Sequence, residues 1–272
     1  MGFITDFGSP EFAVPKVYLH LYGSPKVGKT RTVLKLVAEH RDFMVMISTD
    51  NGLFWVRQEP HLFEKRLAVA SPTNLKELRA DLESGVMRVK QLLRKKVNPS
   101  RIWFVIDNLT HLQQRLLVEA RKVKLKGAGA EIADEMVREV ATEFDWNVNL
   151  GHMSEVASVL ESVPCNVITI ALEKEERDER RATGKIISAI SGQSYNRFVG
   201  DADAVLHLDV DEKDNRFLSV HGDRSNQLPA KLASTDLKLI QADMMPAPPA
   251  PPALEQPKAD GSSSEDSKEK EA

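Results

Sequence analysis

The stretch Gly23-Ser24-Pro25-Lys26-Val27-Gly28-Lys29-Thr30 decides the fold of this chain. It fits the phosphate-loop pattern G-x-x-x-x-G-K-[ST], in which backbone N–H groups turn inward around a phosphate. An apolar run at 17–22 leads into it, and a helical pattern with one apolar face leads out. Strand, glycine loop and helix are the context that this motif requires. The stretch therefore predicts a nucleoside triphosphate site between a strand and a helix.

Each residue type in the loop has a physical task. The two glycines permit backbone conformations that a β-carbon would resist, and the positive end of the following helix attracts anions. Lys29 is predicted to reach the β- and γ-phosphates of ATP, and the Thr30 hydroxyl to hold Mg²⁺. The predicted nucleotide-binding residues are Gly23, Ser24, Pro25, Lys26, Val27, Gly28, Lys29, Thr30 and Arg31.

The composition of the 272 residues is that of an ordinary globular protein, with 42% hydrophobic and 28% charged residues. No apolar run approaches the ~20 residues that span a bilayer, so no membrane partner is expected. The single cysteine, Cys165, excludes an internal disulfide framework and a multi-cysteine zinc site. These features favour a reducing, cytoplasmic setting.

The two ends of the chain differ in composition from its middle. Residues 1–15 are punctuated by Gly and Pro and are interpreted as an N-terminal extension, in which 8–12 resembles a cloning-site remnant. Residues 241–272 form a Pro-rich and then acidic tail, predicted to be disordered because it has little to bury. From position 244 onward, six acidic residues face three lysines. The residues from 244 onward thus account for the net charge of −3, and the tail is interpreted as a solubilising segment or an acidic lure for a partner.

Between these ends, apolar strand patterns alternate with amphipathic helices. Strands are predicted at 17–22, 43–48, 102–107, 166–172, 204–210 and 217–221, and helices at 29–41, 73–95, 110–124, 131–143 and 150–162. Near-continuous apolar strands separated by helices predict a mostly parallel sheet covered by helices on both faces. A short polar turn at 211–215 predicts that the last two strands form an antiparallel hairpin. The predicted fold class is therefore α/β with a C-terminal antiparallel hairpin.

A second functional acid follows from the strand Arg101-Ile102-Trp103-Phe104-Val105-Ile106-Asp107. Downstream of a phosphate loop, an acid at the end of an apolar strand is predicted to bind a water on Mg²⁺. An acid at such a place also caps helices, and this alternative stays open. The predicted metal-binding pair is Thr30 and Asp107.

The strand Val105-Ile106-Asp107-Asn108-Leu109-Thr110 resembles the Walker B strand of the RecA superfamily. The wider pattern is similar to the RecA-like ATPases of bacteriophages linked to single-strand annealing and recombination. Further matching segments are 43–50, Asp145-Trp146, 164–174, 184–192 with 201–205, and His221-Gly222-Asp223-Arg224. The resemblance implies a RecA-like ATPase domain at 16–240, ATP hydrolysis with Mg²⁺, and ATP sites between neighbouring copies of a homo-oligomer.

The resemblance also implies catalytic roles, in which three residues join Lys29 and Asp107. Asp50 stands where RecA relatives usually have Glu and would orient the attacking water, although Asp50-Asn51-Gly52 is also a turn sequence. Glu173 would sense the γ-phosphate or be an ordinary solvent-exposed acid. Arg224 would act as an arginine finger across a subunit boundary or be a surface side chain.

Two basic segments, 121–130 and 174–197, stand where the family carries its DNA-binding loops. Their cations and glycines suit a mobile segment that tracks a phosphate backbone. Acidic residues at 175–179 leave open a self-paired, solvated helix for part of the second segment. Tyr195 and Phe198 would stack on bases or pack this segment against the domain.

The sequence thus favours an ATPase that acts on single-stranded DNA in recombination or annealing. A single-strand-binding or replication protein is a candidate further partner. Two alternatives stay open: a helicase-loader or packaging-type ATPase that acts on a protein partner, and a nucleotide-gated binding module with negligible turnover. Two features keep the second alternative open. Position 50 has Asp in place of Glu, and residues 1–243 have a net charge near zero.

Overall fold

The computed structural model describes residues 16–50, 52–124, 135–137, 139–178, 181–224, 228, 230–233 and 237. The predicted extension at 1–15 and tail at 241–272 lie outside these residues. The same holds for 125–130, the second half of the first basic segment.

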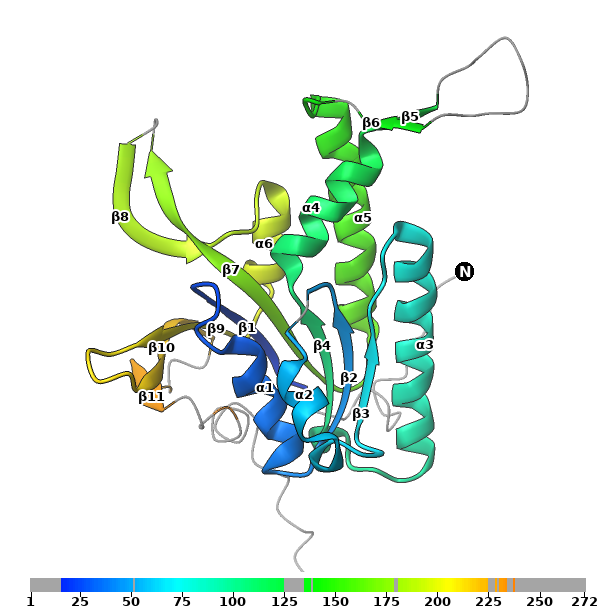
Figure 1. Ribbon diagram of the computed structural model, residues 1–272, viewed down its shortest axis with the longest axis vertical. Coiled ribbons are helices and arrows are strands. Elements are labelled where there is room, and N and C mark those ends of the chain that lie inside the picture. Colours follow the sequence, from blue (N-terminus) through cyan, green and yellow to red (C-terminus); the bar gives the residue numbers. More distant parts are fainter. Residues whose placement is uncertain are drawn as a thin grey trace, which may run out of the picture.

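Within the described residues, the strands form one nine-stranded sheet and one two-stranded ribbon (Figure 1). The strands are β1 (Tyr18–Gly23), β2 (Phe43–Ser48), β3 (Leu67–Ala70), β4 (Ile102–Asp107), β5 (Lys122–Lys124), β6 (Glu135–Val137), β7 (Asn166–Asp178), β8 (Arg181–Ser188), β9 (Ala204–Val210), β10 (Arg216–Asp223) and β11 (Lys231–Ala233). The helices are α1 (Lys29–Ala38), α2 (Phe54–Gln58), α3 (Leu75–Arg94), α4 (Leu109–Ala120), α5 (Glu143–Ser162) and α6 (Gln193–Gly200). None of these helices is long and apolar enough to cross a membrane.

The strand order of the main sheet is β11-β10-β9-β1-β7-β4-β2-β3, with β8 paired to β7. From β9 to β3 all neighbours are parallel. The strands β8, β10 and β11 run antiparallel to their partners. The predicted α/β class, with a mostly parallel sheet and a C-terminal antiparallel hairpin, is confirmed. The carboxyl ends of the parallel strands meet at one edge, which is where such sheets bind ligands.

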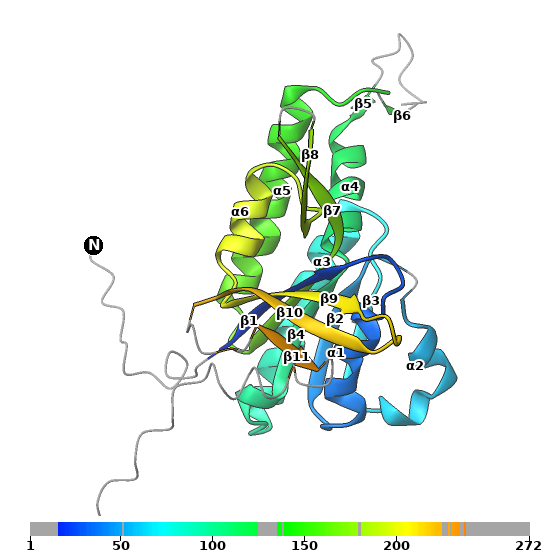
Figure 2. The same ribbon diagram turned by 90° about the vertical axis from the view of Figure 1, so that its left-hand side faces the viewer.

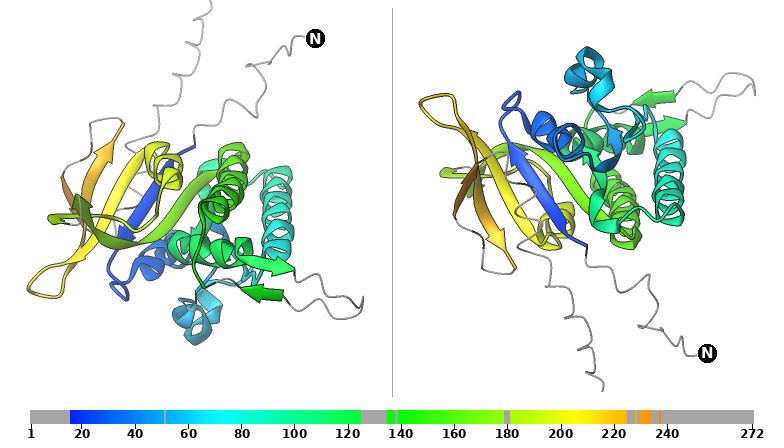
Figure 3. Two further views of the ribbon diagram at one scale, coloured as in Figure 1. Left: turned by 90° about the horizontal axis from the view of Figure 1, so that it is seen from above. Right: turned by 90° about the horizontal axis from the view of Figure 1, so that it is seen from below.

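Apolar side chains of the described strands pack into a core on each face of the sheet, and Figure 3 shows helices on both sides. In β4, Phe104 packs into the core under α3, α4 and α5, whereas Trp103 packs into the core under α1. Both side chains are fully buried. This double cover explains why the strands read as near-continuous apolar runs, since neither face is exposed to water.

Some predicted elements differ from the observed ones. The helix predicted at 131–143 is wrong, because its described part contains β6, which pairs antiparallel with β5. The helix considered within 174–179 is also wrong, because β7 continues to Asp178 and returns as β8. Helix α5 begins at Glu143, earlier than the expected residue 150, because Thr142 and Asp145 form a capping box there.

The β7–β8 hairpin extends beyond the carboxyl edge of the sheet, as Figures 1 and 2 show. Up to Leu172, β7 pairs with β1 or β4. From Glu173 onward its partner is β8. The part of the second predicted basic segment that lies in β7 and β8 is therefore an arm attached to a central strand, whereas the end of the segment lies in α6.

Candidate nucleotide-binding site

The phosphate loop joins β1 to α1 at the carboxyl edge of the sheet (Figure 1). A β-carbon on Gly23 would lie 2.4 Å from the carbonyl oxygen of Leu208 on β9, so no larger residue fits. Gly28 is the N-cap of α1 and has a φ of 107°, which L side chains rarely adopt. The two motif glycines are therefore required by one close approach and one backbone conformation.

The Lys29 side chain folds back into its own loop. Its Nζ donates hydrogen bonds to the carbonyl oxygens of Gly23, at 2.8 Å, and Ser24, at 2.7 Å. Burial lowers the pKa of Lys29, and the nearby carboxylates of Asp107, Glu173 and Asp50 oppose that shift. A phosphate in the loop would meet a partly desolvated ammonium group, which interacts with anions more strongly than a hydrated one.

Thr30 and Asp107, the predicted metal-binding pair, are in direct contact. The Thr30 hydroxyl donates to Asp107 Oδ2 at 2.7 Å. Burial raises the pKa of Asp107 to about 7, with a further contribution from the charge of Asp50. Because β7 lies between β1 and β4, this contact comes from the first turn of α1 and not from adjacent strands. The alternative of a helix cap at Asp107 is wrong, since Asn108 caps α4 by accepting from the Thr110 N–H.

Asp50 follows β2, which is separated from β1 by β4 and β7. The sequence favours Asp50 at the end of a strand beside the phosphate loop, and this placement of its strand is wrong. Its Oδ1 accepts the Gly52 N–H at 2.8 Å, so the predicted turn is present. The turn packs on the loop: a β-carbon on Gly52 would lie 2.9 Å from Thr30 Oγ1. Asp50 therefore lies close to the metal-binding pair through a turn, and its role in hydrolysis stays a prediction.

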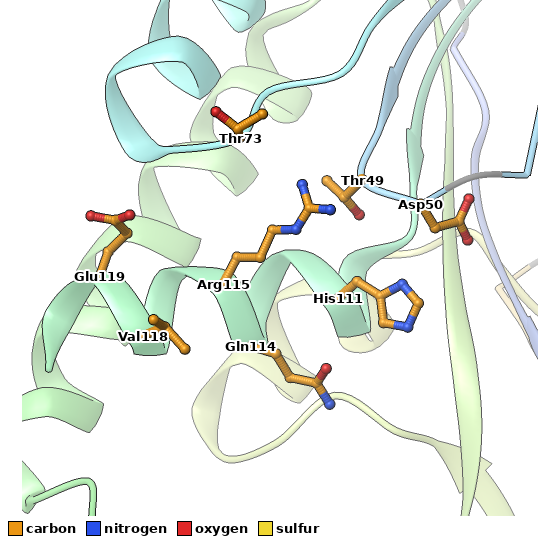
Figure 4. Close-up of a pocket in the computed structure, with 8 residues that line it drawn as sticks. All are labelled: Thr49, Asp50, Thr73, His111, Gln114, Arg115, Val118 and Glu119. Atoms are coloured by element: carbon orange, nitrogen blue, oxygen red, sulfur yellow. The ribbon is translucent and has the colours of Figure 1, made fainter. Parts of the chain in front are cut away.

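An open cavity of about 590 Å³ adjoins Asp50, between the end of β2, the segment before α3, and α4 (Figure 4). Thr49, His111 and Gln114 contribute to its polar lining. Arg115 extends from α4 into this region and donates to the carbonyl oxygen of Pro72 at 2.8 Å. Water can therefore reach Asp50, as a group that orients an attacking water requires.

Glu173 connects three elements at the loop. It accepts a hydrogen bond from the hydroxyl of Ser24 in the phosphate loop. Its other carboxylate oxygen lies 2.7 Å from Nε2 of His207, on β9. The side chain of Glu173 is only 22% exposed, so the interpretation as an ordinary solvent-exposed acid is wrong.

His207 and Arg216 lie against this site, although neither is among the site residues that the sequence predicts. Arg216 begins β10, and its Nε donates to the carbonyl oxygen of Val27 at 2.7 Å. The same nitrogen would lie 2.9 Å from a β-carbon on Gly28. For Arg216, the predicted turn at 211–215 was the available signal. The strand after this turn begins at the edge of the sheet where the phosphate loop lies. For His207, no sequence motif marks the position.

The structure does not bring Arg224 to the phosphate loop of its own chain. It follows β10, whose last residue pairs with Ala204, the first residue of β9. Arg224 there donates to the carbonyl oxygen of Gly200 at 2.9 Å and forms an ion pair with Asp203 at 3.6 Å. Its predicted role across a subunit boundary stays a prediction.

The remaining predicted loop residues have distinct surroundings. The guanidinium of Arg31 lies over the ring of Trp55 on α2, 5.3 Å from its centroid. Pro25 and Lys26 are exposed and Val27 is buried. Among the described residues, no three His, Cys, Asp or Glu side chains gather into a metal centre. A metal here would therefore depend on Thr30, Asp107 and a bound phosphate.

This fold and this loop define a P-loop protein with a mostly parallel α/β sheet. A family model described as an AAA domain matches residues 16–234. The chain belongs to this AAA domain family.

No curated protein matches the chain. Among solved structures, it is similar to a KaiC-like protein from the hyperthermophilic archaeon Pyrococcus horikoshii OT3. That match has 14% identity, covers 81% of this chain and 86% of the other, and has a TM-score of 0.45. It is also similar to the RadB recombinase, with 18% identity, coverage of 78% and 83%, and a TM-score of 0.45.

Proposed function

We propose that this chain is a cytoplasmic ATPase that acts on single-stranded DNA in recombination or annealing. One observation carries the proposal: Glu173 contacts Ser24 of the phosphate loop and also begins the part of β7 that forms the projecting hairpin. A change at the γ-phosphate position can therefore act on the hairpin through one side chain. The hairpin is the part of the molecule proposed to contact DNA.

ATP and Mg²⁺ fit the residues at the loop. Lys29 and the loop N–H groups would hold the β- and γ-phosphates. The oxygens of Thr30 and Asp107, 2.7 Å apart, are the hard ligands that Mg²⁺ prefers, directly or through water. A cation would also favour the ionised form of the buried Asp107, which burial alone disfavours. When bound, Mg²⁺ would supply positive charge that neutralises the negative charge developing on the phosphates.

The protein's own groups would then divide the chemical work. Lys29 stabilises negative charge on the transferred phosphoryl group. Asp50, beside the open cavity, orients the attacking water. A phosphate in the loop competes with Glu173 for the Ser24 hydroxyl, which would change the hydrogen bonding of Glu173 at the base of the hairpin.

Exposed cations on the hairpin support the assignment of DNA as the partner. Lys174, Arg177 and Lys185 are exposed, and Lys185 pairs with Glu176 at 3.5 Å. A surface ion pair of this kind contributes ~0–1 kcal/mol, so a DNA phosphate can displace it at little cost. Binding through such contacts weakens steeply with salt.

A homo-oligomer is part of the proposal because of Arg224. It lies at the amino edge of the sheet, whereas the phosphate loop lies at the carboxyl edge. An arginine finger at this position would have to act on the loop of a neighbouring copy.

The test is ATP hydrolysis with and without single-stranded DNA, measured across a salt series. We expect single-stranded DNA to stimulate turnover and duplex DNA of the same sequence to do so less. Arg177→Glu with Lys185→Glu should abolish the stimulation, because the hairpin would then repel phosphate. Lys90→Glu, a charge reversal at an exposed position of α3, is the matched control and should retain it.

Other outcomes identify the alternatives. Turnover that ignores DNA but rises with a replication protein would favour a loader or packaging-type ATPase. Tight ATP binding without turnover would favour a nucleotide-gated binding module.

A further inference from the structure

A second cavity, of about 380 Å³, lies between α4, α5 and the loop that leads into α6. The residues that line it include four with carboxamide side chains, Gln113, Asn147, Asn149 and Gln193, together with Trp146. None of the described residues that line it carries a charge. The cavity is therefore chemically different from the nucleotide site, where acids and cations meet.

Hydrogen bonds hold the walls of this cavity together. Gln113 on α4 donates from Nε2 to the carbonyl oxygen of Ser191 at 3.0 Å and accepts the Ser191 N–H at 2.9 Å. Asn149 on α5 donates to the carbonyl oxygen of Gln113 at 2.9 Å. The three segments are thus joined before any ligand arrives, which lowers the entropic cost of binding.

The lining selects a neutral, flat ligand with hydrogen-bonding edges. Trp146, in the first turns of α5, is 42% exposed and offers an aromatic face. The carboxamide of a Gln or Asn side chain carries both donors and an acceptor, and those of Asn147 and Gln193 are the ones considered for the ligand, because Gln113 and Asn149 hold the walls. Because no described residue of the lining is charged, the lining cannot form an ion pair with a phosphate or a metal ion. A nucleobase matches this set, because it stacks on aromatic rings and pairs its edge with Asn and Gln side chains.

We propose that this cavity receives one unpaired nucleobase, stacked on Trp146 and hydrogen-bonded by Asn147 and Gln193. The proposal rests on the proposed function, because β8 of the DNA-contacting hairpin leads through Ser191 directly into the cavity wall. Lys174 marks the same path, since its Nζ donates to the carbonyl oxygen of Ile190 at 3.2 Å. A strand that follows the hairpin would arrive with a base beside Trp146.

This inference changes the assignment of the stacking side chain. Of the two aromatic residues that the sequence suggested, Phe198 is fully buried and Tyr195 packs against the core. Both serve to hold α6 on the domain. Trp146 is exposed at a cavity, although the sequence marks it only as part of the matching segment Asp145-Trp146.

The test compares base-bearing and abasic DNA strands of equal length and charge. Fluorescence anisotropy of the full chain with ATP and Mg²⁺ would use strands of ~20 nucleotides, longer than one domain's site. We expect the base-bearing strand to bind about tenfold more tightly, the low end of the range for stacking one base. Trp146→Ala should reduce its affinity to that of the abasic strand, whose own affinity stays unchanged.

Three further variants make the result specific to the cavity. Trp146→Phe keeps an aromatic face and should retain most of the preference for bases. Gln193→Ala should lose part of it. Asn196→Ala removes an exposed amide from the same helix outside the cavity lining and should change nothing.

The outcomes distinguish a failure of the cavity proposal from a failure of the proposed function. Equal binding of both strands by the wild-type chain would overturn the cavity proposal and leave the DNA-dependent ATPase intact. If neither strand binds, the proposed function fails, and titration with free nucleosides decides the cavity alone. Quenching of tryptophan fluorescence that is lost in Trp146→Phe would assign the cavity to free nucleosides, and no quenching would overturn it.

Discussion

Arg216 and Arg224 lie at opposite ends of one strand, and they meet different surroundings. Arg216 begins β10 at the carboxyl edge of the sheet, where its Nε donates to the carbonyl oxygen of Val27. Arg224 follows β10 at the amino edge, where it contacts Gly200 and Asp203. Eight strand residues separate these edges by roughly 25 Å at ~3.3 Å per residue.

The family resemblance points to Arg224, whereas the fold brings Arg216 to the phosphate loop of its own chain. The direction of β10 decides this, because the turn before it returns the chain to the edge where β1 ends. The comparison teaches that a residue's distance from a motif along the sequence says little about which site it serves. Strand direction brings Arg216 to the chain's own loop and keeps Arg224 away from it.

The largest expected effect belongs to Lys29, the cation that Arg216 would assist. Lys29→Ala should lower ATP hydrolysis by about 100- to 1000-fold, the range for removing one charge-stabilising donor. Single-turnover hydrolysis measures it. Lys35→Ala, a later lysine of α1, is the control and should change the rate by less than about twofold. An unchanged rate in Lys29→Ala would mean that the phosphate loop takes no part in ATP hydrolysis.

The two arginines themselves come next. Arg216→Ala should weaken ATP binding by about tenfold even in dilute protein, because the charged hydrogen bond that holds the phosphate loop at Val27 is lost within one chain. Arg224→Ala should leave ATP affinity in dilute protein unchanged. It should lower hydrolysis only at concentrations where copies assemble. Equilibrium binding and hydrolysis across a protein concentration series separate the two effects.

Equal defects in both arginine variants at low concentration would break the comparison. Arg216→Lys sharpens it further, since this variant keeps the charge but loses the planar guanidinium.

Glu173→Gln should have a smaller effect. It should weaken the coupling between single-stranded DNA and ATP hydrolysis and leave the affinity for ATP nearly unchanged. The amide can still accept from Ser24, but it no longer carries the charge that faces His207. We expect stimulation by single-stranded DNA to fall about fivefold, as for loss of a modest coupling free energy, with ATP affinity nearly unchanged. Loss of ATP affinity with stimulation intact would show that Glu173 only shapes the loop.

The last effect is on stability and not on activity, and it concerns β1, the strand that leads into the phosphate loop. Buried His20 bonds to Thr169 Oγ1 at 2.9 Å and Ser188 Oγ at 3.0 Å, and burial lowers its pKa to about 3. The folded state therefore favours neutral His20, and its contribution is complete above the unfolded pKa of about 6.5. It is lost as the pH falls from there towards 3. Between pH 7.5 and 5.5 this group should cost about 1.4 kcal/mol of unfolding free energy.

Urea unfolding of the wild type and His20→Gln at both pH values checks this. Asp107, whose pKa is raised, acts in the opposite sense, so the difference between the two slopes is the measure. Equal slopes would mean that folding does not lower the pKa of His20.

Some of the site follows from local sequence. The phosphate loop needs glycine at 23 and 28 for reasons of backbone geometry, and Asp107 ends a strand that the apolar pattern marks. The strands of the parallel core other than β3, and the terminal hairpin, follow from hydrophobic periodicity and turn chemistry. The β7–β8 arm does not, because its charged residues carry no apolar pattern that distinguishes a strand from a solvated helix.

The sequence by itself therefore determined the class of protein, the loop and the metal-binding pair as candidates, because these depend on residues near one another in the chain. Only the tertiary structure decided which distant residues join them. Glu173 meets Ser24 across 149 positions, and Arg216 meets Val27 across 189. These contacts depend on the strand order β9-β1-β7-β4. Because all four strands are similarly apolar, the sequence of one strand does not determine which strands become its neighbours. The uncharged cavity at Trp146 has the same origin, since three separate segments form it.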